Sequence, residues 1–135
     1  MFSARIKEKW ARAKRILSAM AKPDHIALVE SAHGGDKDVV QALLTMGIDI
    51  NIVNGNRGDT ALTAASSEGH TDVVRLLLGK GANIHATNSF GMSAATLARR
   101  QDRNGSHSEI VKMLEAAEQQ TRIIREAAFL RFTPL

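Results

Sequence analysis

Residues 68–85 of the chain read EGHTDVVRLLLGKGANIH, and residues 34–51 read GGDKDVVQALLTMGIDIN. Aligned at an offset of 34 positions without a gap, both stretches place a Gly, a Val-Val pair, a Leu-Leu pair and a second Gly at the same positions. A third and shorter copy, HSEIVKML, begins at His107, which lies 37 positions after His70. A period of about 33 residues is far longer than a helical turn or a heptad, so each copy is a supersecondary unit in a repeat array.

Each unit predicts a pair of helices. Residues 60–68 predict a short Ala-rich helix with Thr60 as its N-cap and Gly69 as the left-handed residue after its end. We expect a second helix that has Thr71 as its N-cap and ends at Gly79–Gly81. One such pair cannot bury its apolar face alone, so neighbouring pairs must complete a common core.

These residues resemble the ankyrin repeat, whose pattern is Asp-x-x-Gly-x-Thr-Pro-Leu-His-x-Ala, followed by Gly-His, Val-Val, Leu-Leu-Leu and Gly-Ala-Asp-x-Asn. The matching positions are, in the first copy, Leu28, Gly35, Val39, Val40, Leu43, Leu44, Gly47, Asp49 and Asn51; in the second, Gly58, Thr60, Leu62, Ala65, Gly69, His70, Val73, Val74, Leu76, Leu77, Leu78, Gly81 and Ala82; and in the third, Asn88, Gly91, Ser93, Ala98, His107, Ile110, Val111 and Leu114. The resemblance covers residues 23–117. It implies an all-α ankyrin-repeat solenoid of three helix-turn-helix repeats, at about 23–53, 54–86 and 87–117, with flanking N- and C-terminal helices.

The chain departs from the family pattern at three kinds of position. The motif His, which hydrogen-bonds along the stack in the family, is replaced by Val29, Thr63 and Thr96, so we expect lower local stability. The loop at residues 54–59 is one residue longer than the pattern. About four extra residues, around Gln101–Asn104, separate the helices of the third repeat, an insertion that costs little stability in a surface loop.

The first 22 residues carry most of the positive charge of the chain. Seven basic residues face the single Glu8, which gives this segment a net charge of +6, against +4 for the whole chain. On a helical wheel the basic residues separate from an apolar stripe that contains Phe2, Ile6, Trp10, Ala13, Leu17 and Met20. The pattern predicts a basic amphipathic helix over residues 2–21, which ends before Pro23.

Three interpretations of this basic helix are open. It is a capping helix, over residues 1–22, whose apolar stripe covers the first repeat. Alternatively, it is a surface that binds an acidic partner, an anionic membrane or nucleic acid. In the third interpretation it is an organelle-targeting presequence, which is typically rich in Arg and poor in acidic residues.

At the other end, residues 108–131 contain no Gly or Pro and predict a single helix. The last 18 residues, 118–135, are therefore interpreted as a helical extension with an apolar tail, whose large side chains are Phe129, Leu130, Phe132 and Leu135. Two interpretations are open for this tail. It folds back and caps the third repeat, or it is an exposed patch that docks a partner or a second copy of the chain as a homodimer.

No pattern in the sequence predicts catalysis, a cofactor or a metal site, so we do not expect an enzyme. His70 with Asp72, and His107 with Glu109, are spaced like ligand or acid–base pairs. Both His residues nevertheless occupy the Gly-His position of the repeat, where a loop hydrogen bond is the expected role. No Ser-His-Asp geometry, phosphate-binding loop or calcium loop accompanies them. Cys is absent from the sequence, which excludes disulfides and thiolate metal sites.

Composition and patterning also favour a particular compartment. No apolar run approaches the roughly 20 residues that a membrane-spanning helix requires. Residues 1–22 carry charges where a secretory signal would have its apolar core. We therefore expect an intracellular, cytoplasmic protein, with organelle targeting by the N-terminal helix as the alternative.

The resemblance implies that the chain binds another protein, as an adaptor or as an inhibitor that covers its partner's surface. Ankyrin repeats bind through the concave face of their inner helices and through the fingers, the loops that precede those helices. The matching positions are Asn56, Arg57, Asp59, Ser89, Phe90 and Met92 in the fingers, and His33, Ser67, Glu68, Arg100 and Gln101 at the ends of the inner helices. Phe90 is the strongest candidate, because binding hot spots favour aromatic residues and Arg. In an alternative interpretation Phe90 packs against the loop near Arg103.

Overall fold

The computed structural model describes residues 7–8, 11–14, 16, 25–54 and 57–132. The helices with defined bounds are α2 (His25–His33), α3 (Lys37–Thr45), α4 (Ala61–Glu68), α5 (Thr71–Gly79), α6 (Ala94–Gln101) and α7 (Ser108–Phe132). They form three consecutive pairs: α2 with α3, α4 with α5, and α6 with α7.

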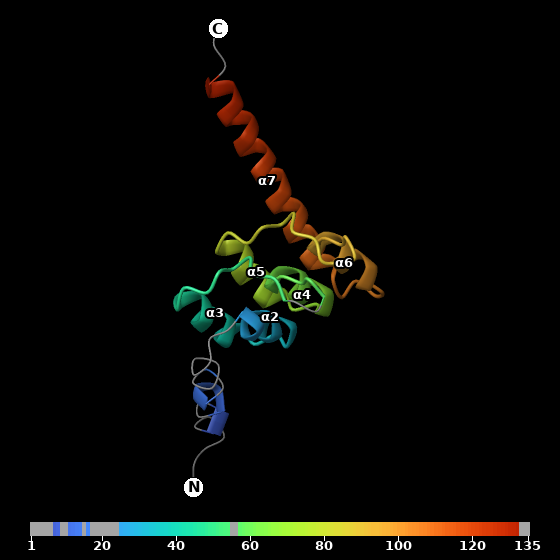
Figure 1. The fold of residues 1–135 in the computed structure, drawn as a ribbon. Helices are drawn as coiled ribbons and strands as arrows, with labels where there is room; N and C mark the ends of the chain where they lie inside the picture. The colour runs from blue at the N-terminus through green and yellow to red at the C-terminus, as the bar shows by residue number, and fades with distance from the viewer. Residues whose placement is uncertain (1–6, 9–10, 15, 17–24, 55–56, 133–135) are drawn as a thin grey trace.

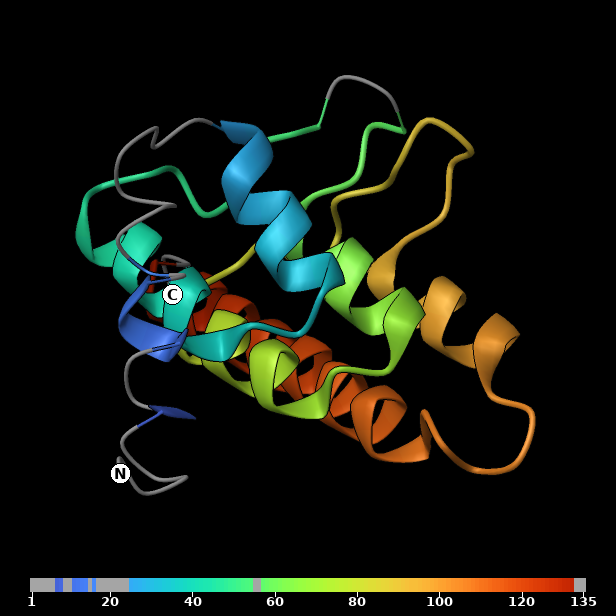
Figure 2. The ribbon, with the colours of Figure 1, turned by 90° about the horizontal axis from the view of Figure 1, so that it is seen from below.

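The pairs stack in two layers, which is the architecture of a solenoid. The inner helices α2, α4 and α6 lie side by side, and the outer helices α3 and α5 form the second layer with the first half of α7 (Figure 2). Loops 46–60 and 80–93 each lead from one pair to the next inner helix and carry the fingers. The predicted all-α solenoid of three helix-turn-helix repeats is confirmed.

Apolar side chains from every repeat form one continuous core between the layers. Its largest fully buried members are Leu28, Val40, Leu43, Leu62, Val73, Val74, Leu77 and Ile110. Small residues on the inner helices allow those helices to approach closely, and the buried ones are Ala32, Ala61, Ala64, Ala65, Ala94 and Ala98. Because each large side chain contributes about 1.5–3 kcal/mol on burial, neighbouring repeats stabilise one another.

The caps of the second pair follow the sequence prediction at one helix and not at the other. The Thr60 hydroxyl accepts from the backbone N–H of Thr63, and the Thr63 hydroxyl accepts from the backbone N–H of Thr60. Thr63, at the family's His position, thus completes a capping box. Gly69 ends α4 with a φ of 82°. The prediction that Thr71 caps α5 is wrong, because the His70 carbonyl accepts the first helical bond and Thr71 lies inside the helix.

The insertion in the third repeat lies where the sequence places it. The connection between α6 and α7 occupies residues 102–107, whereas residues 69–70 alone connect α4 and α5. The Asp102 carboxylate accepts from the backbone N–H of His107, at 3.2 Å, and closes the longer loop. The extra residues therefore leave the register of the third outer helix intact.

Parts of the predicted N-terminal helix are described, at residues 7–8, 11–14 and 16, and all of these are helical. The Arg12 Nε lies 2.9 Å from a carboxylate oxygen of Asp38 on α3. Ile16 is half-buried and packs against the core. Trp10 and the rest of the predicted helix lie outside the described residues.

Of the two interpretations of the C-terminal tail, the one in which it folds back onto the third repeat is wrong for the residues that are described. The second half of α7 leaves the stack and extends away from the other helices (Figure 1). Ile123 and Leu130 are 63% and 74% exposed. The reason is that a fold-back requires a break in the helix, and no Gly or Pro interrupts residues 106–133. None of the helices within the described ranges is both long and apolar enough to cross a membrane.

Candidate partner-binding surface

The finger of the third repeat is a tight turn organised by one side chain. The Asn88 Oδ1 accepts from the backbone N–H groups of Phe90 and Met92, at 3.0 and 3.1 Å. The backbone N–H of Asn88 donates to the Met92 carbonyl at 3.0 Å, and Thr87 and Ser93 form an isolated antiparallel bridge below the turn. The finger is therefore fixed by its own hydrogen bonds.

Phe90 lies at the tip of this turn, and its side chain is 65% exposed. The alternative in which it packs against the loop near Arg103 is therefore wrong. The sequence patterns above did not single out Asn88 as the organising residue. An Asn three residues before a Gly was nevertheless an available signal, because Asn side chains commonly close such turns.

The fingers of the second and third repeats are joined. The backbone N–H of Ser89 donates to the Arg57 carbonyl at 3.0 Å. Gly58 permits this approach, because it has a φ of 67° and a Cβ there would lie 2.5 Å from the Ser89 hydroxyl. Because this hydrogen bond joins the two fingers, Arg57 and Phe90 lie on adjacent fingers, and both residues are exposed. Asn56 lies outside the described residues.

Asp59 supports its finger more than it offers a contact surface. Its carboxylate accepts from the Thr63 hydroxyl at 3.3 Å, and its carbonyl accepts from the backbone N–H of Asn54 at 2.9 Å. The residue is half-buried. The Asp59 carboxylate therefore joins its finger to the start of α4.

The end of α6 reaches back to the third finger. The guanidinium Nη1 of Arg100 lies 3.6 Å from the Met92 sulfur, and Arg100 is exposed whereas Met92 is half-buried. Gln101 is also exposed. The Arg100 side chain thus links the end of α6 to the finger of the third repeat.

The ends of α2 and α4 form a second group. The His33 Nε2 lies 3.2 Å from a carboxylate oxygen of Glu68. The His70 ring donates to the His33 carbonyl at 2.8 Å, and the His107 ring donates to the Ser67 carbonyl at 3.1 Å. Both loop His residues therefore make the hydrogen bonds predicted for them, each to the preceding repeat.

Close backbone approach makes these two His contacts possible. A Cβ on Gly35, which has a φ of 75°, would lie 2.6 Å from the His70 ring, and a Cβ on Gly69 would lie 3.0 Å from the His107 ring. Across the described residues, no group of three or more His, Cys, Asp or Glu side chains is placed to hold a metal ion. The groups that the candidate surface presents are the exposed side chains of its fingers and the charged side chains at its helix ends.

A family model for ankyrin repeats, in three copies, matches residues 25–124, which is most of the chain. The matched range contains all three helix pairs and ends within α7. None of the curated proteins compared with the chain matches it.

Proposed function

We propose that this chain, which belongs to the ankyrin-repeat family, binds a partner protein through the fingers of its second and third repeats and the adjoining end of α6. Ankyrin repeats are in general protein–protein interaction modules and are typically non-catalytic. The observation that carries the proposal is the exposure of Phe90 on a finger that its own hydrogen bonds hold in place. A preorganised anchor loses little conformational entropy on binding.

The chemistry of this surface suggests the kind of segment that it binds. Arg57 lies on the finger joined to that of Phe90, and Arg100 contacts Met92, so two exposed guanidinium groups accompany two apolar side chains. Such a surface suits a partner segment that presents an apolar side chain between carboxylates. The chain then acts sterically, as an adaptor or as an inhibitor that covers the bound surface, and it uses no cofactor.

The test compares two double variants in a pull-down followed by calorimetric titration against the captured protein. Arg57→Ala with Phe90→Ala should weaken binding by at least about thirtyfold. Its free energy of unfolding should change by less than about 1 kcal/mol, because neither side chain belongs to the core. The matched control is Arg125→Ala with Phe129→Ala, which removes the same residue types from α7. Equal affinity of both variants and wild type would move the site away from the fingers.

The alternative function, binding of nucleic acid or an anionic membrane through residues 1–22, rests on the charge of +6 in that segment. The contacts of Arg12 with Asp38 and of Ile16 with the core support a capping role instead. The two functions differ in their response to salt. Affinity for a polyanion falls steeply with ionic strength, whereas binding anchored by Phe90 depends on it weakly.

A further inference from the structure

Helix α7 carries a second apolar face, which runs from the edge of the repeats to the C-terminal end of the helix. Its residues alternate at spacings of three and four, as positions a and d of a heptad do, and they are Met113, Ala116, Gln120, Ile123, Ala127 and Leu130. We call this set the α7 seam. Met113 is half-buried, and the other five residues are exposed.

Beyond Met113, which packs against the core at the edge of the repeats, the seam points away from the repeats of its own chain. The residues by which α7 packs on the stack are the buried Ile110 and Leu114, with the half-buried Val111 and Met113 beside them. At about 100° per residue, the mean direction of Ile110 and Leu114 lies roughly 130° from that of the seam. A second helix can therefore approach the seam without displacing the repeats.

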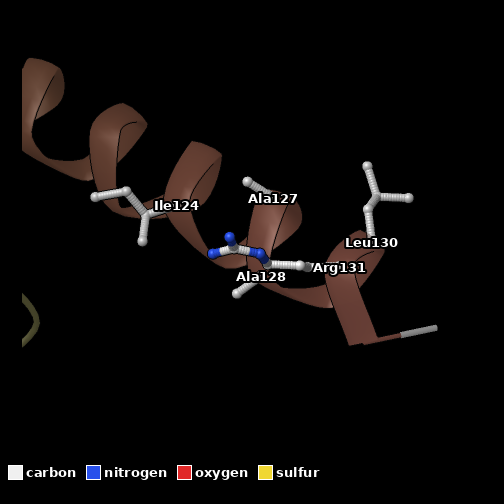
Figure 3. A pocket seen from close by; sticks show the side chains of 5 residues that line it. All are labelled: Ile124, Ala127, Ala128, Leu130 and Arg131. Carbon is white, nitrogen blue, oxygen red and sulfur yellow. The ribbon is translucent and has the colours of Figure 1, made fainter.

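Figure 3 shows the far end of this region, where five side chains of α7 line a shallow depression: Ile124, Ala127, Ala128, Leu130 and Arg131. Ala127 and Leu130 project from one side of the helix and Ala128 from another. All five residues come from a single helix, so they form an open face. The small side chain of Ala127 would let a partner helix lie close.

The charges beside the seam are complementary to those of a second, parallel copy. In a parallel pair, a residue at position g lies beside the residue five positions later, at position e, of the other helix. Glu126 and Arg131 occupy these two positions, so two symmetric Glu–Arg pairs form. Among the described residues, neither side chain is engaged in an ion pair within its own chain.

Gln120 selects the parallel orientation. At position a of a parallel dimer the two Gln120 side chains meet at the symmetry axis, where one amide can donate to the other. An antiparallel pair would set Gln120 against an apolar d residue and leave a buried amide without a partner, which is costly. A single polar residue at position a is a known device for fixing register and oligomeric state.

We propose that two copies of this chain associate in parallel through the α7 seam. The seam covers roughly two and a half heptads and includes two Ala residues, so it buries little apolar area and the association is weak. The fraction of dimer therefore rises with protein concentration. The fingers take no part in this contact. The proposal is therefore independent of the partner-binding function.

Sedimentation equilibrium of the full chain tests the association. The mass should rise with concentration from the 14.6 kDa of one chain toward twice that value. Ile123→Glu should raise the dissociation constant at least about tenfold, with an unchanged circular dichroism spectrum. The matched control, Phe129→Glu, adds the same charge at a 72% exposed position outside the seam and should behave as wild type. A monomer at every concentration, with or without binding to lipid vesicles, would overturn the proposal, as would a dimer that tolerates Ile123→Glu.

Charge reversal tests the pairing of Glu126 with Arg131. Glu126→Arg and Arg131→Glu should each weaken the dimer, and the double variant should restore it. A double variant no tighter than the weaker single variant would contradict the pairing.

Cross-linking tests the orientation, and the absence of native Cys makes each introduced thiol unique. Ala116→Cys and Ala127→Cys should each form a disulfide-linked dimer on oxidation, because a parallel pair brings every seam position next to its own copy. Glu118→Cys, on the far side of α7, is the control and should remain monomeric under denaturing conditions. An antiparallel pair cannot bring both seam positions to their own copies, so linkage at one or neither would reject the parallel arrangement.

Discussion

Single side chains show how the stack tolerates departures from its family's pattern. Thr63 stands where the family has His, and it uses its hydroxyl locally, in the capping box with Thr60. Ser66 lies on the same helix and is fully buried, yet its hydroxyl has no hydrogen-bond partner among the described residues. Ser31 on α2 of the preceding repeat is half-buried, and its hydroxyl donates to the Ala27 carbonyl at 2.6 Å. Within the described part of the chain, the Ser66 hydroxyl is the one buried side-chain group without a hydrogen-bond partner.

Ser66→Ala should stabilise the protein by about 1 kcal/mol, because burial of an unpaired hydroxyl costs about 1–3 kcal/mol and Ala favours the helix. Chemical denaturation measures the difference. The control is Ser67→Ala on the next, half-buried position, where only the smaller helix-propensity gain is expected. A loss of stability in Ser66→Ala would show that the hydroxyl is satisfied in solution.

At the scale of helices, most of the architecture could be predicted from the sequence, because aligning the repeats shows which positions are equivalent. The Val-Val and Leu-Leu pairs recur at one spacing, and this recurrence alone is enough to identify the buried face of α3 and α5. The prediction of Thr71 as the N-cap of α5 rests on residue type alone. It is wrong because the His70 carbonyl accepts the first helical hydrogen bond, which makes His70 the N-cap. The apolar composition of the tail left a fold-back and an exposed patch both open, and the continuity of α7 excludes the fold-back for the described residues.

In the candidate surface, too, the residues at repeat positions could be predicted from the sequence, whereas the contacts between them could not. Finger positions such as Arg57 and Phe90 follow from repeat register, so they could be named from sequence. The contact between Arg100 and Met92 depends on the reach of a long side chain across α6, and the link between Ser89 and Arg57 depends on backbone approach. Neither has a periodic signature. That a partner binds these residues is still a prediction.

Leu77 is fully buried between the layers and tests the register directly. Leu77→Ala should reduce the free energy of unfolding by about 2–5 kcal/mol, through lost burial and the cavity left behind. Leu78→Ala, at the half-buried neighbouring position, should cost less. Denaturant unfolding compares the two. Equal losses, or a loss below about 1 kcal/mol at Leu77, would contradict the assigned register.

For the whole molecule, the two ends of the solenoid differ in how their apolar surface is covered. Near the N-terminus, Ile16 packs on the core and Arg12 pairs with Asp38, which supports the interpretation of the basic segment as a cap. At the other end, α7 continues past the repeats with its apolar face exposed. An end repeat of a solenoid requires a cover such as the N-terminal one, because it buries only one of its two faces against a neighbour.

The capping interpretation predicts that Ile16→Asp destabilises the protein by about 1–3 kcal/mol, because it places a charge against the core. Ala11→Asp adds the same charge at an exposed position of the same segment and should change stability by less than about 0.5 kcal/mol. Thermal melting of both variants provides the comparison. Identical melting curves would instead favour the basic segment as a binding surface.

The two ring contacts, from His70 to the His33 carbonyl and from His107 to the Ser67 carbonyl, have a consequence for how the stack breathes. Each hydrogen bond links two adjacent repeats, so the middle repeat is linked on both sides and each outer repeat on one side only. Local opening should therefore start at the ends, and backbone amides of α4 should exchange with deuterium more slowly than those of α2 or α6. An end repeat that has opened should also close again readily. The middle repeat keeps the His70 ring in place for the first repeat and the Ser67 carbonyl in place for the third.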